Sequence, residues 1–168
     1  NAIRHKYNVH GKLLPTLIIS PLITLENWKN ELLRFSKIPA ANIHVLKGTG
    51  AKKLSTFRVE TAKNPSQIFI VNYDALSNDE LNEALRKWMP QVLIVDESHH
   101  VKNPTAKRTK KIMKLADTAM YRYILSGTPI LNSPMDIFTQ MYILDLGKRF
   151  GTKFHFFKLK YFWDVNVG

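Results

Sequence analysis

Five short segments of this chain are apolar at nearly every position and rich in β-branched side chains. Continuous runs of that kind are typical of strands in a parallel sheet whose two faces are both covered. The segments are Thr16–Ser20, Ile43–Leu46, Gln67–Asn72, Gln91–Val95 and Tyr121–Leu125. We therefore predict five strands, of which Tyr121–Leu125 has the fewest aliphatic side chains and is bounded by Ser126 and Gly127.

Between these segments, apolar side chains recur at the spacing of an amphipathic helix. The helical segments are 22–35, Ala51–Ala62, Asn78–Trp88, Thr105–Ala116 and Pro134–Leu146. We expect Thr24 to cap the first of these helices. Strands that alternate with helices of about a dozen residues indicate repeated βαβ units. The pattern predicts an α/β fold with a parallel sheet, in a single domain that covers residues 1–168.

Both ends of the chain have patterns that predict a neighbour. Residues 1–15 are typical of the last turns of a helix, followed by a turn at Gly11. Residues 150–168 are aromatic and basic, and we expect these aromatics to pack in a core or between domains rather than against nucleic-acid bases. We interpret the chain as part of a longer protein, with a loop and helix before it and a second domain after it.

Charge and composition narrow the class of partner. The chain carries 25 Lys and Arg against 13 Asp and Glu, a formal net charge of +12, which favours nucleic acid. Lys107, Lys111 and Lys114 share a helical face that is either a phosphate-tracking stripe or simply solvated. The absence of cysteine excludes disulfides and thiolate metal sites. No apolar run approaches the roughly 18 residues of a membrane span. We therefore expect a soluble, cytoplasmic protein, nucleoid-associated in a bacterium or phage and nuclear in a eukaryote.

The most informative polar residues follow the fourth predicted strand. Asp96 and Glu97 come directly after its last aliphatic residue, at the sheet edge where α/β proteins bind ligands. In nucleotide hydrolases, one carboxylate of such a pair holds Mg²⁺ and the other orients the attacking water. The alternative is a pair of solvated acids with a capping role. His99 and His100 stand near by without a third histidine at ligand spacing. We expect no zinc, and a metal-dependent hydrolase is a further alternative.

Two other strand ends carry hydroxyl groups. Ser126, Gly127 and Thr128 follow the fifth strand, where they are placed to sense a phosphate or the neighbouring acids. An ordinary turn between strand and helix is the alternative. Ser20 and Thr24 flank the start of the helix after the first strand, and the free amides of a helix N-terminus readily bind phosphate. Capping alone is the alternative there.

Four segments resemble, in order, motifs Ia, Ib, II and III of the Swi/Snf-like branch of superfamily-two helicases. They read LIISPLITLENWKNEL, IFIVNYDAL, VLIVDESHHVKNP and YILSGTPILNSPMDIFTQMYIL and cover about residues 16–150. Two positions depart from the family: Ser98 stands where Ala or Gly is common, and Leu131 stands where Gln is usual before Asn132. The resemblance implies the first RecA-like lobe of an ATP-driven DNA translocase, with helices on both faces of its sheet.

The resemblance also implies roles for single residues. Asp96 would hold Mg²⁺ through water, and Glu97 would be the catalytic base. His99 and the segment Ser126–Gly127–Thr128 would couple the state of the nucleotide to movement of the lobes. The residues along the nucleic acid would be Ser20, Pro21, Thr24, Asn72, Tyr73 and Lys102. The implied cofactors are ATP and Mg²⁺, and the implied partners are duplex DNA and the second lobe of the same protein.

The family's phosphate-binding loop, G-x-G-K-[ST], does not occur in these 168 residues. Lys47–Lys53 (KGTGAKK) has glycines and lysines but lacks the required spacing and the Ser or Thr after the lysine. We interpret it as an ordinary turn. The arginine finger of the second lobe is not among these residues either, so we expect negligible hydrolysis by this chain alone. A non-catalytic nucleic-acid-binding or docking module is the alternative function.

Overall fold

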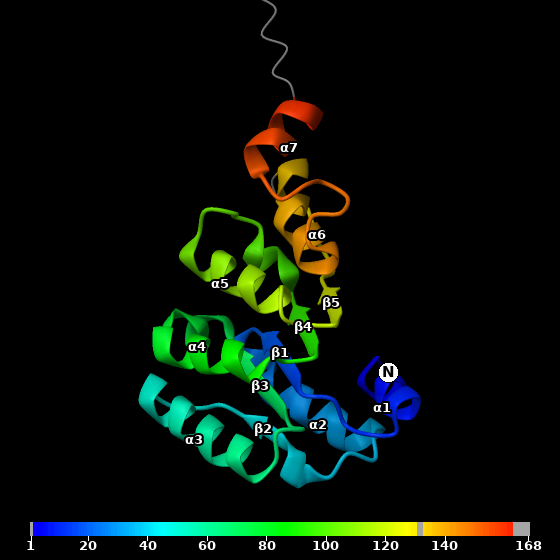
Figure 1. Cartoon of the computed structure of the whole chain (residues 1–168), viewed down its shortest axis with the longest axis vertical. Helices are drawn as coiled ribbons and strands as arrows, with labels where there is room; N and C mark the ends of the chain where they lie inside the picture. The colour runs from blue at the N-terminus through cyan, green and yellow to red at the C-terminus, as the bar shows by residue number, and fades with distance from the viewer. Residues whose placement is uncertain (1, 131–132, 163–168) are drawn as a thin grey trace, which may run out of the picture.

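A computed structural model describes residues 2–130 and 133–162 of the chain. Its sheet has five strands, all parallel, in the order β2-β3-β1-β4-β5 (Figure 1). The strands are β1 (Thr16–Ser20), β2 (Ile43–Val45), β3 (Ile68–Asn72), β4 (Val92–Asp96) and β5 (Tyr121–Leu125). All five predicted strands are confirmed, with ends that agree within one residue. Leu131 and Asn132 of the family pattern, and the C-terminal Trp163, lie outside the described residues.

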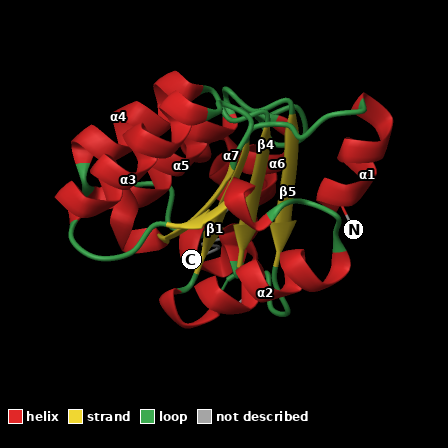
Figure 2. Cartoon of the chain, turned by 90° about the horizontal axis from the view of Figure 1, so that it is seen from below, coloured by secondary structure: helices red, strands yellow, loops and turns green. Residues whose placement is uncertain are grey.

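Helices cover both faces of the sheet. They are α1 (Ala2–His10), α2 (Leu25–Phe35), α3 (Gly50–Lys63), α4 (Asp79–Trp88), α5 (Lys107–Ala116), α6 (Ile137–Asp145) and α7 (Phe154–Tyr161). α3, α4 and α5 lie on one face, and α1 and α2 lie on the other (Figure 2). α6 packs against α5 and β5, and α7 stands beyond it at one end of the molecule (Figure 1). The predicted α/β fold with a doubly covered parallel sheet is confirmed.

Each face of the sheet buries its own hydrophobic cluster. Because successive side chains of a strand point to opposite faces, Leu17 and Ile19 of β1 pack toward α3, α4 and α5, while Ile18 packs toward α1 and α2. Phe69 of β3 is fully buried in the first cluster, with its ring against Phe57 and Trp88. Burial on both faces explains the continuous apolar runs of these strands.

The start of α2 differs from the predicted cap. Thr24 does precede the helix, but its hydroxyl makes no bond to a helix amide. It donates to the carbonyl of Pro21 at 3.0 Å and lies 2.5 Å from Ser20 Oγ. A 3₁₀ turn over Leu22–Thr24 leads into the helix. The Thr24 hydroxyl therefore contacts groups at the end of β1 and does not cap the helix.

The C-terminal aromatics pack together around α7. Phe157 is buried and its ring contacts those of Phe138, Phe150 and Tyr161. This packing agrees with the prediction of a core role for these side chains. Phe156, on the same helix, is 67% exposed.

Candidate active site

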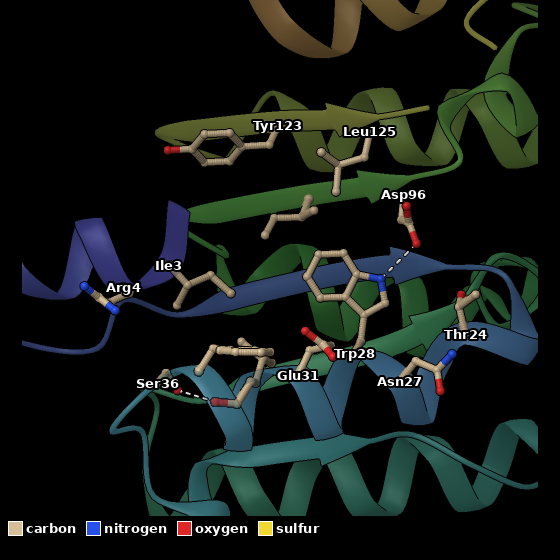
Figure 3. Close-up of a pocket in the computed structure, with 13 residues that line it drawn as sticks. Ile3, Arg4, Thr24, Asn27, Trp28, Glu31, Ser36, Asp96, Tyr123 and Leu125 are labelled. Atoms are coloured by element: carbon tan, nitrogen blue, oxygen red, sulfur yellow. Dashed lines mark hydrogen bonds between the residues drawn. The ribbon is translucent and has the colours of Figure 1, made fainter. Parts of the chain in front are cut away.

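Asp96 is the last residue of β4, and three groups donate hydrogen bonds to its carboxylate. Ser20 Oγ and Trp28 Nε1 both donate to Oδ2, each at 2.8 Å, and the second of these bonds is drawn in Figure 3. The amide of Glu97 donates to Oδ1 at 3.0 Å. β1 and β4 are neighbours in the sheet, so the parallel topology itself brings Ser20 to Asp96. The two side chains therefore fix the carboxylate through one oxygen.

A cavity of about 660 Å³ opens beside Asp96, between α2 and the ends of β4 and β5. Figure 3 shows Asp96 and Thr24 at one end of it and Arg4 of α1 at the other. The walls between them are largely apolar and include Trp28 and Leu125. A volume of this order is typical of sites for small molecules and cofactors.

Glu97 has an unusual backbone conformation. Its φ of 49° and ψ of 55° lie in the left-handed region, which costs a residue with a side chain about 1–2 kcal/mol. Such conformations persist where the surrounding structure imposes them, often at active sites. The Glu97 side chain is 42% exposed, and its Oε2 lies 3.2 Å from His99 Nδ1. The second acid is thus open to water, in contrast to the bonded Asp96.

His99 connects two loops, which we name here. The acid loop is Glu97–Val101, and the hydroxyl loop is Ser126–Pro129. His99 Nδ1 lies 3.4 Å from Ser126 Oγ, which in turn accepts the amide of Thr128 at 3.2 Å. The structure therefore brings together the residues that we predicted to couple. No other part of the described structure approaches the backbone of Gly127 closely, since a Cβ added there would meet no atom within 4 Å.

Three residues that we predicted along the nucleic acid have buried side chains with internal partners. Ser20 donates to Asp96, Asn72 Oδ1 accepts a bond from Lys53 at 3.1 Å, and Tyr73 Oη donates to the Asp96 carbonyl at 2.5 Å. Burial and the nearby Asp96 charge raise the pKa of Tyr73. These side chains support the strand ends from within. Contact with nucleic acid stays a prediction for them.

The other residues of that predicted surface are partly exposed. Pro21 and Thr24 lie at the end of β1, and Lys102 Nζ lies 3.8 Å from Asp136 Oδ2.

On α5, Lys111 neither tracks phosphate nor is solvated, the two interpretations given above for the lysine face of this helix. The Lys111 side chain is 12% exposed, and its ammonium donates to the carbonyls of Leu76 and Ser77, with the Asp79 carboxylate 2.6 Å away. Lys111 therefore ties α5 to the segment before α4 and does not face solvent.

The glycine- and lysine-rich segment Lys47–Lys53 lies at the far side of the sheet from β5. It joins β2 to α3, where Thr49 caps the helix by accepting the amide of Lys52. β2 is three strand positions from β4 in the sheet, or about 14 Å at the usual strand spacing. The segment is therefore a turn that leads into the first residues of α3, and its Lys53 extends toward the ends of the central strands to donate a hydrogen bond to Asn72.

Trp28 is the residue of this site that sequence reasoning missed. Its spacing with the other apolar positions of α2 predicts a core side chain, and its ring does pack on the sheet. The bond from its indole N–H to Asp96 joins residues 68 positions apart and leaves no local signal in the sequence. It depends on the packing of α2 against the sheet beside the end of β4.

Trp28→Phe should lower the free energy of unfolding by about 1.5–3 kcal/mol, because it removes a donor to a charged oxygen and keeps an aromatic ring. Urea unfolding of this chain measures the change. Trp88→Phe is the matched control: Trp88 donates to the neutral carbonyl of Pro65, and its loss should be about 1 kcal/mol. Equal losses in the two variants would contradict the role of Trp28 at Asp96.

Two further findings concern metals and membranes. Within residues 2–130 and 133–162, no three His, Cys, Asp or Glu side chains gather closely enough to hold a metal ion. The expectation that the protein binds no zinc stays a prediction. Over the same described ranges, none of the helices has the length and apolar character needed to cross a membrane.

Known proteins are similar to this chain in sequence. The chain is 31% identical to putative protein p41 of Acyrthosiphon pisum secondary endosymbiont phage 1, over 99% of this chain and 36% of that protein. It is 30% identical to the SWI/SNF-related matrix-associated actin-dependent regulator of chromatin subfamily A-like protein 1 homolog of Caenorhabditis elegans, over 88% of this chain and 20% of that protein. The chain thus spans 36% or less of the length of these relatives.

A solved structure has the same fold. The Sulfolobus solfataricus SWI2/SNF2 ATPase core in complex with dsDNA matches 95% of this chain and 30% of that chain, with a TM-score of 0.74 and 28% identity. The five-stranded parallel sheet is therefore the RecA-like fold of these ATPase cores. The sequence model of the SNF2-related domain matches residues 1–164, and this chain accordingly belongs to the SNF2-related family of helicase-like ATPases.

Proposed function

We propose that this chain is part of an ATP-driven motor that moves along duplex DNA, and that it supplies the two carboxylates of the hydrolytic site. The observation that carries the proposal is the pair of acids at the end of β4 in a SNF2-related domain. The surroundings of the two acids differ, as two different roles require. Asp96 is held by Ser20 and Trp28, whereas Glu97 is accessible beside His99.

Asp96 fits the role of a Mg²⁺ ligand through water. Its Oδ1 accepts the amide of Glu97 and retains acceptor capacity for a hydrated cation. The hydroxyls of Ser20 and Thr24 add further oxygens on the side of Oδ2, and oxygen is the ligand that Mg²⁺ prefers. When bound with ATP, Mg²⁺ would neutralise charge on the phosphates. Trp28 and Ser20 would keep the carboxylate in one orientation.

Glu97 fits the role of the base. A general base needs an accessible carboxylate that can accept a proton from water. His99 stands 3.2 Å from that carboxylate and 3.4 Å from Ser126 Oγ. It is therefore placed to orient Glu97 and to transmit a change in the hydroxyl loop. The same geometry supports coupling roles for Ser126 and Thr128, and Gly127, which lies between them, is included in the proposal as part of that loop.

Turnover is the direct test. We expect duplex DNA to stimulate ATP hydrolysis by the full-length protein, which would also contain the phosphate-binding loop and second lobe. The 168 residues alone should show no turnover under the same conditions, because they contain no G-x-G-K-[ST] loop to hold the β- and γ-phosphates. A full-length protein that binds DNA but hydrolyses no ATP would instead support the non-catalytic binding module.

Binding of this chain to duplex DNA should weaken at least about tenfold between roughly 50 and 200 mM salt. The net charge of +12 predicts phosphate contacts, and each neutralised phosphate contributes about −0.9 to the slope of log affinity against log salt. Fluorescence anisotropy with a labelled duplex measures this slope. An affinity that is insensitive to salt would contradict a role for the basic surface, and a preference for RNA over DNA would contradict the proposed substrate.

A further inference from the structure

A buried amide side chain joins the acid loop to the hydroxyl loop. Gln140 of α6 and Ser98, the residue after Glu97, are both 0% exposed. Ser98 Oγ donates to Gln140 Oε1 at 2.6 Å. Gln140 Nε2 donates to the carbonyl of Pro129 at 2.5 Å and to that of Asp136 at 2.9 Å. One side chain therefore contacts both loops at the same time.

Packing alone does not account for Gln140. Its buried neighbours on α6 include Phe138 and Ile143, and a leucine would fill a similar volume without needing partners. Burying an amide without hydrogen bonds is unfavourable, because the group loses its bonds to water and gains none in return. Both ends of this amide are bonded, and a fully satisfied buried network fixes one arrangement of the groups that it joins. The amide therefore specifies how the two loops sit relative to each other.

Two more contacts join the start of α6 and the residue before it to Lys102, which directly follows the acid loop. Thr139 Oγ1 donates to the carbonyl of Lys102 at 3.4 Å, and Lys102 Nζ lies 3.8 Å from Asp136 Oδ2. The direct contact between the loops, from His99 to Ser126, is also 3.4 Å and only partly buried. Gln140 thus provides the shorter and more deeply buried connection.

We propose that Gln140 is a positioning residue that couples the hydroxyl loop to Glu97. This inference rests on the proposed function. Ser98 follows Glu97 and Pro129 follows Thr128, so a displacement of either loop reaches the other through the Gln140 amide. Chains of buried contacts transmit such displacements when they join elements with two arrangements. The left-handed backbone of Glu97 makes the acid loop responsive, because that conformation persists only while its surroundings impose it.

The test compares Gln140→Leu with the double variant Ser98→Ala/Gln140→Leu. The single variant breaks the link and leaves the Ser98 hydroxyl buried without its acceptor. The double variant removes that hydroxyl while the link stays broken, so it separates stability from coupling. Met141→Leu, the next residue of α6, is the matched control. Thermal unfolding of this chain measures its stability. Hydrogen exchange measures how often each loop opens, at the amide of His100 in the acid loop and at the amide of Thr128 in the hydroxyl loop. These amides donate to Glu97 O and to Ser126 Oγ, respectively.

We expect Gln140→Leu to speed exchange of both amides at least tenfold and to leave α3 unchanged. In the double variant, the melting temperature should return toward that of the unmodified chain while both amides still exchange rapidly. DNA-stimulated ATP turnover of the full-length double variant should stay at least tenfold below that of the unmodified full-length protein, with the KM for ATP unchanged. Recovery of slow exchange and of turnover together with stability would show a purely structural role and overturn the proposal.

The outcome is separable from that of the proposed function. If the full-length protein hydrolyses no ATP, the proposed function fails, and the exchange rates still show whether Gln140 links the two loops. Unchanged exchange at His100 and Thr128 in a folded Gln140→Leu variant overturns the link, whatever the turnover.

Discussion

Glu97→Gln should reduce the DNA-stimulated ATP turnover of the full-length protein by at least about a hundredfold, since a positioned general base contributes about 10²–10⁴ to a rate. Glutamine has nearly the same shape as glutamate but cannot accept a proton from water. Because the Glu97 side chain is 42% exposed, the substitution buries no new polar group. Stability and binding of ATP should therefore change little, and the loss should fall on kcat.

Glu83→Gln is the control for this variant. Glu83 is an exposed acid on α4 that pairs with Arg86 and Lys87 on its own helix. The change in charge is the same, but turnover should stay within about twofold, because exposed pairs of this kind contribute at most about 1 kcal/mol. If Glu97→Gln retains the turnover of Glu83→Gln, Glu97 is not the base.

Phe69→Ala should lower the free energy of unfolding by about 3–5 kcal/mol, a large part of the stability of a domain of this size. Phe69 is fully buried, and its ring touches His44, Phe57 and Trp88 from three separate elements. Truncation leaves a cavity at a point where the sheet, α3 and the end of α4 meet. Denaturant unfolding followed by tryptophan fluorescence measures the change.

Phe156→Ala is the matched control for the core. The same atoms are removed from a side chain that is 67% exposed, so stability should change by less than about 0.5 kcal/mol. A loss for Phe69→Ala as small as that of the control would mean that the first hydrophobic cluster does not hold the sheet to its helices.

The sheet was predictable because its local signal and its three-dimensional environment agree. A strand buried on both faces needs apolar side chains at nearly every position, and residues 68–71 of β3 and 92–95 of β4 show that requirement directly. The ends of the strands are set by other contacts. Gln67 is not part of β3, and its side chain bonds to His44 and to the Glu60 carbonyl.

The acids of the candidate site were predictable, but the groups around them were not. Asp96 and Glu97 stand out because two carboxylates after an aliphatic strand are unusual. The bonds from Ser20, Trp28 and Gln140 depend on which strands and helices become neighbours. No spacing within the sequence encodes them. The same is true of Lys111, whose position on a basic helix face suggests solvent while its ammonium is held by carbonyls before α4.

The bond between Ser20 and Asp96 has a kinetic consequence. It joins residues 76 positions apart in the sequence. β1 lies between β3 and β4 in the sheet, and both pairings must form before the ends of these strands lie side by side. Parallel pairing over such separations requires long loops to close, which makes folding slow. The carboxylate environment therefore forms only when the central sheet is complete. A nascent chain that has emerged only as far as β3 lacks both β4 and Asp96, so the chemistry should appear in a late step of folding.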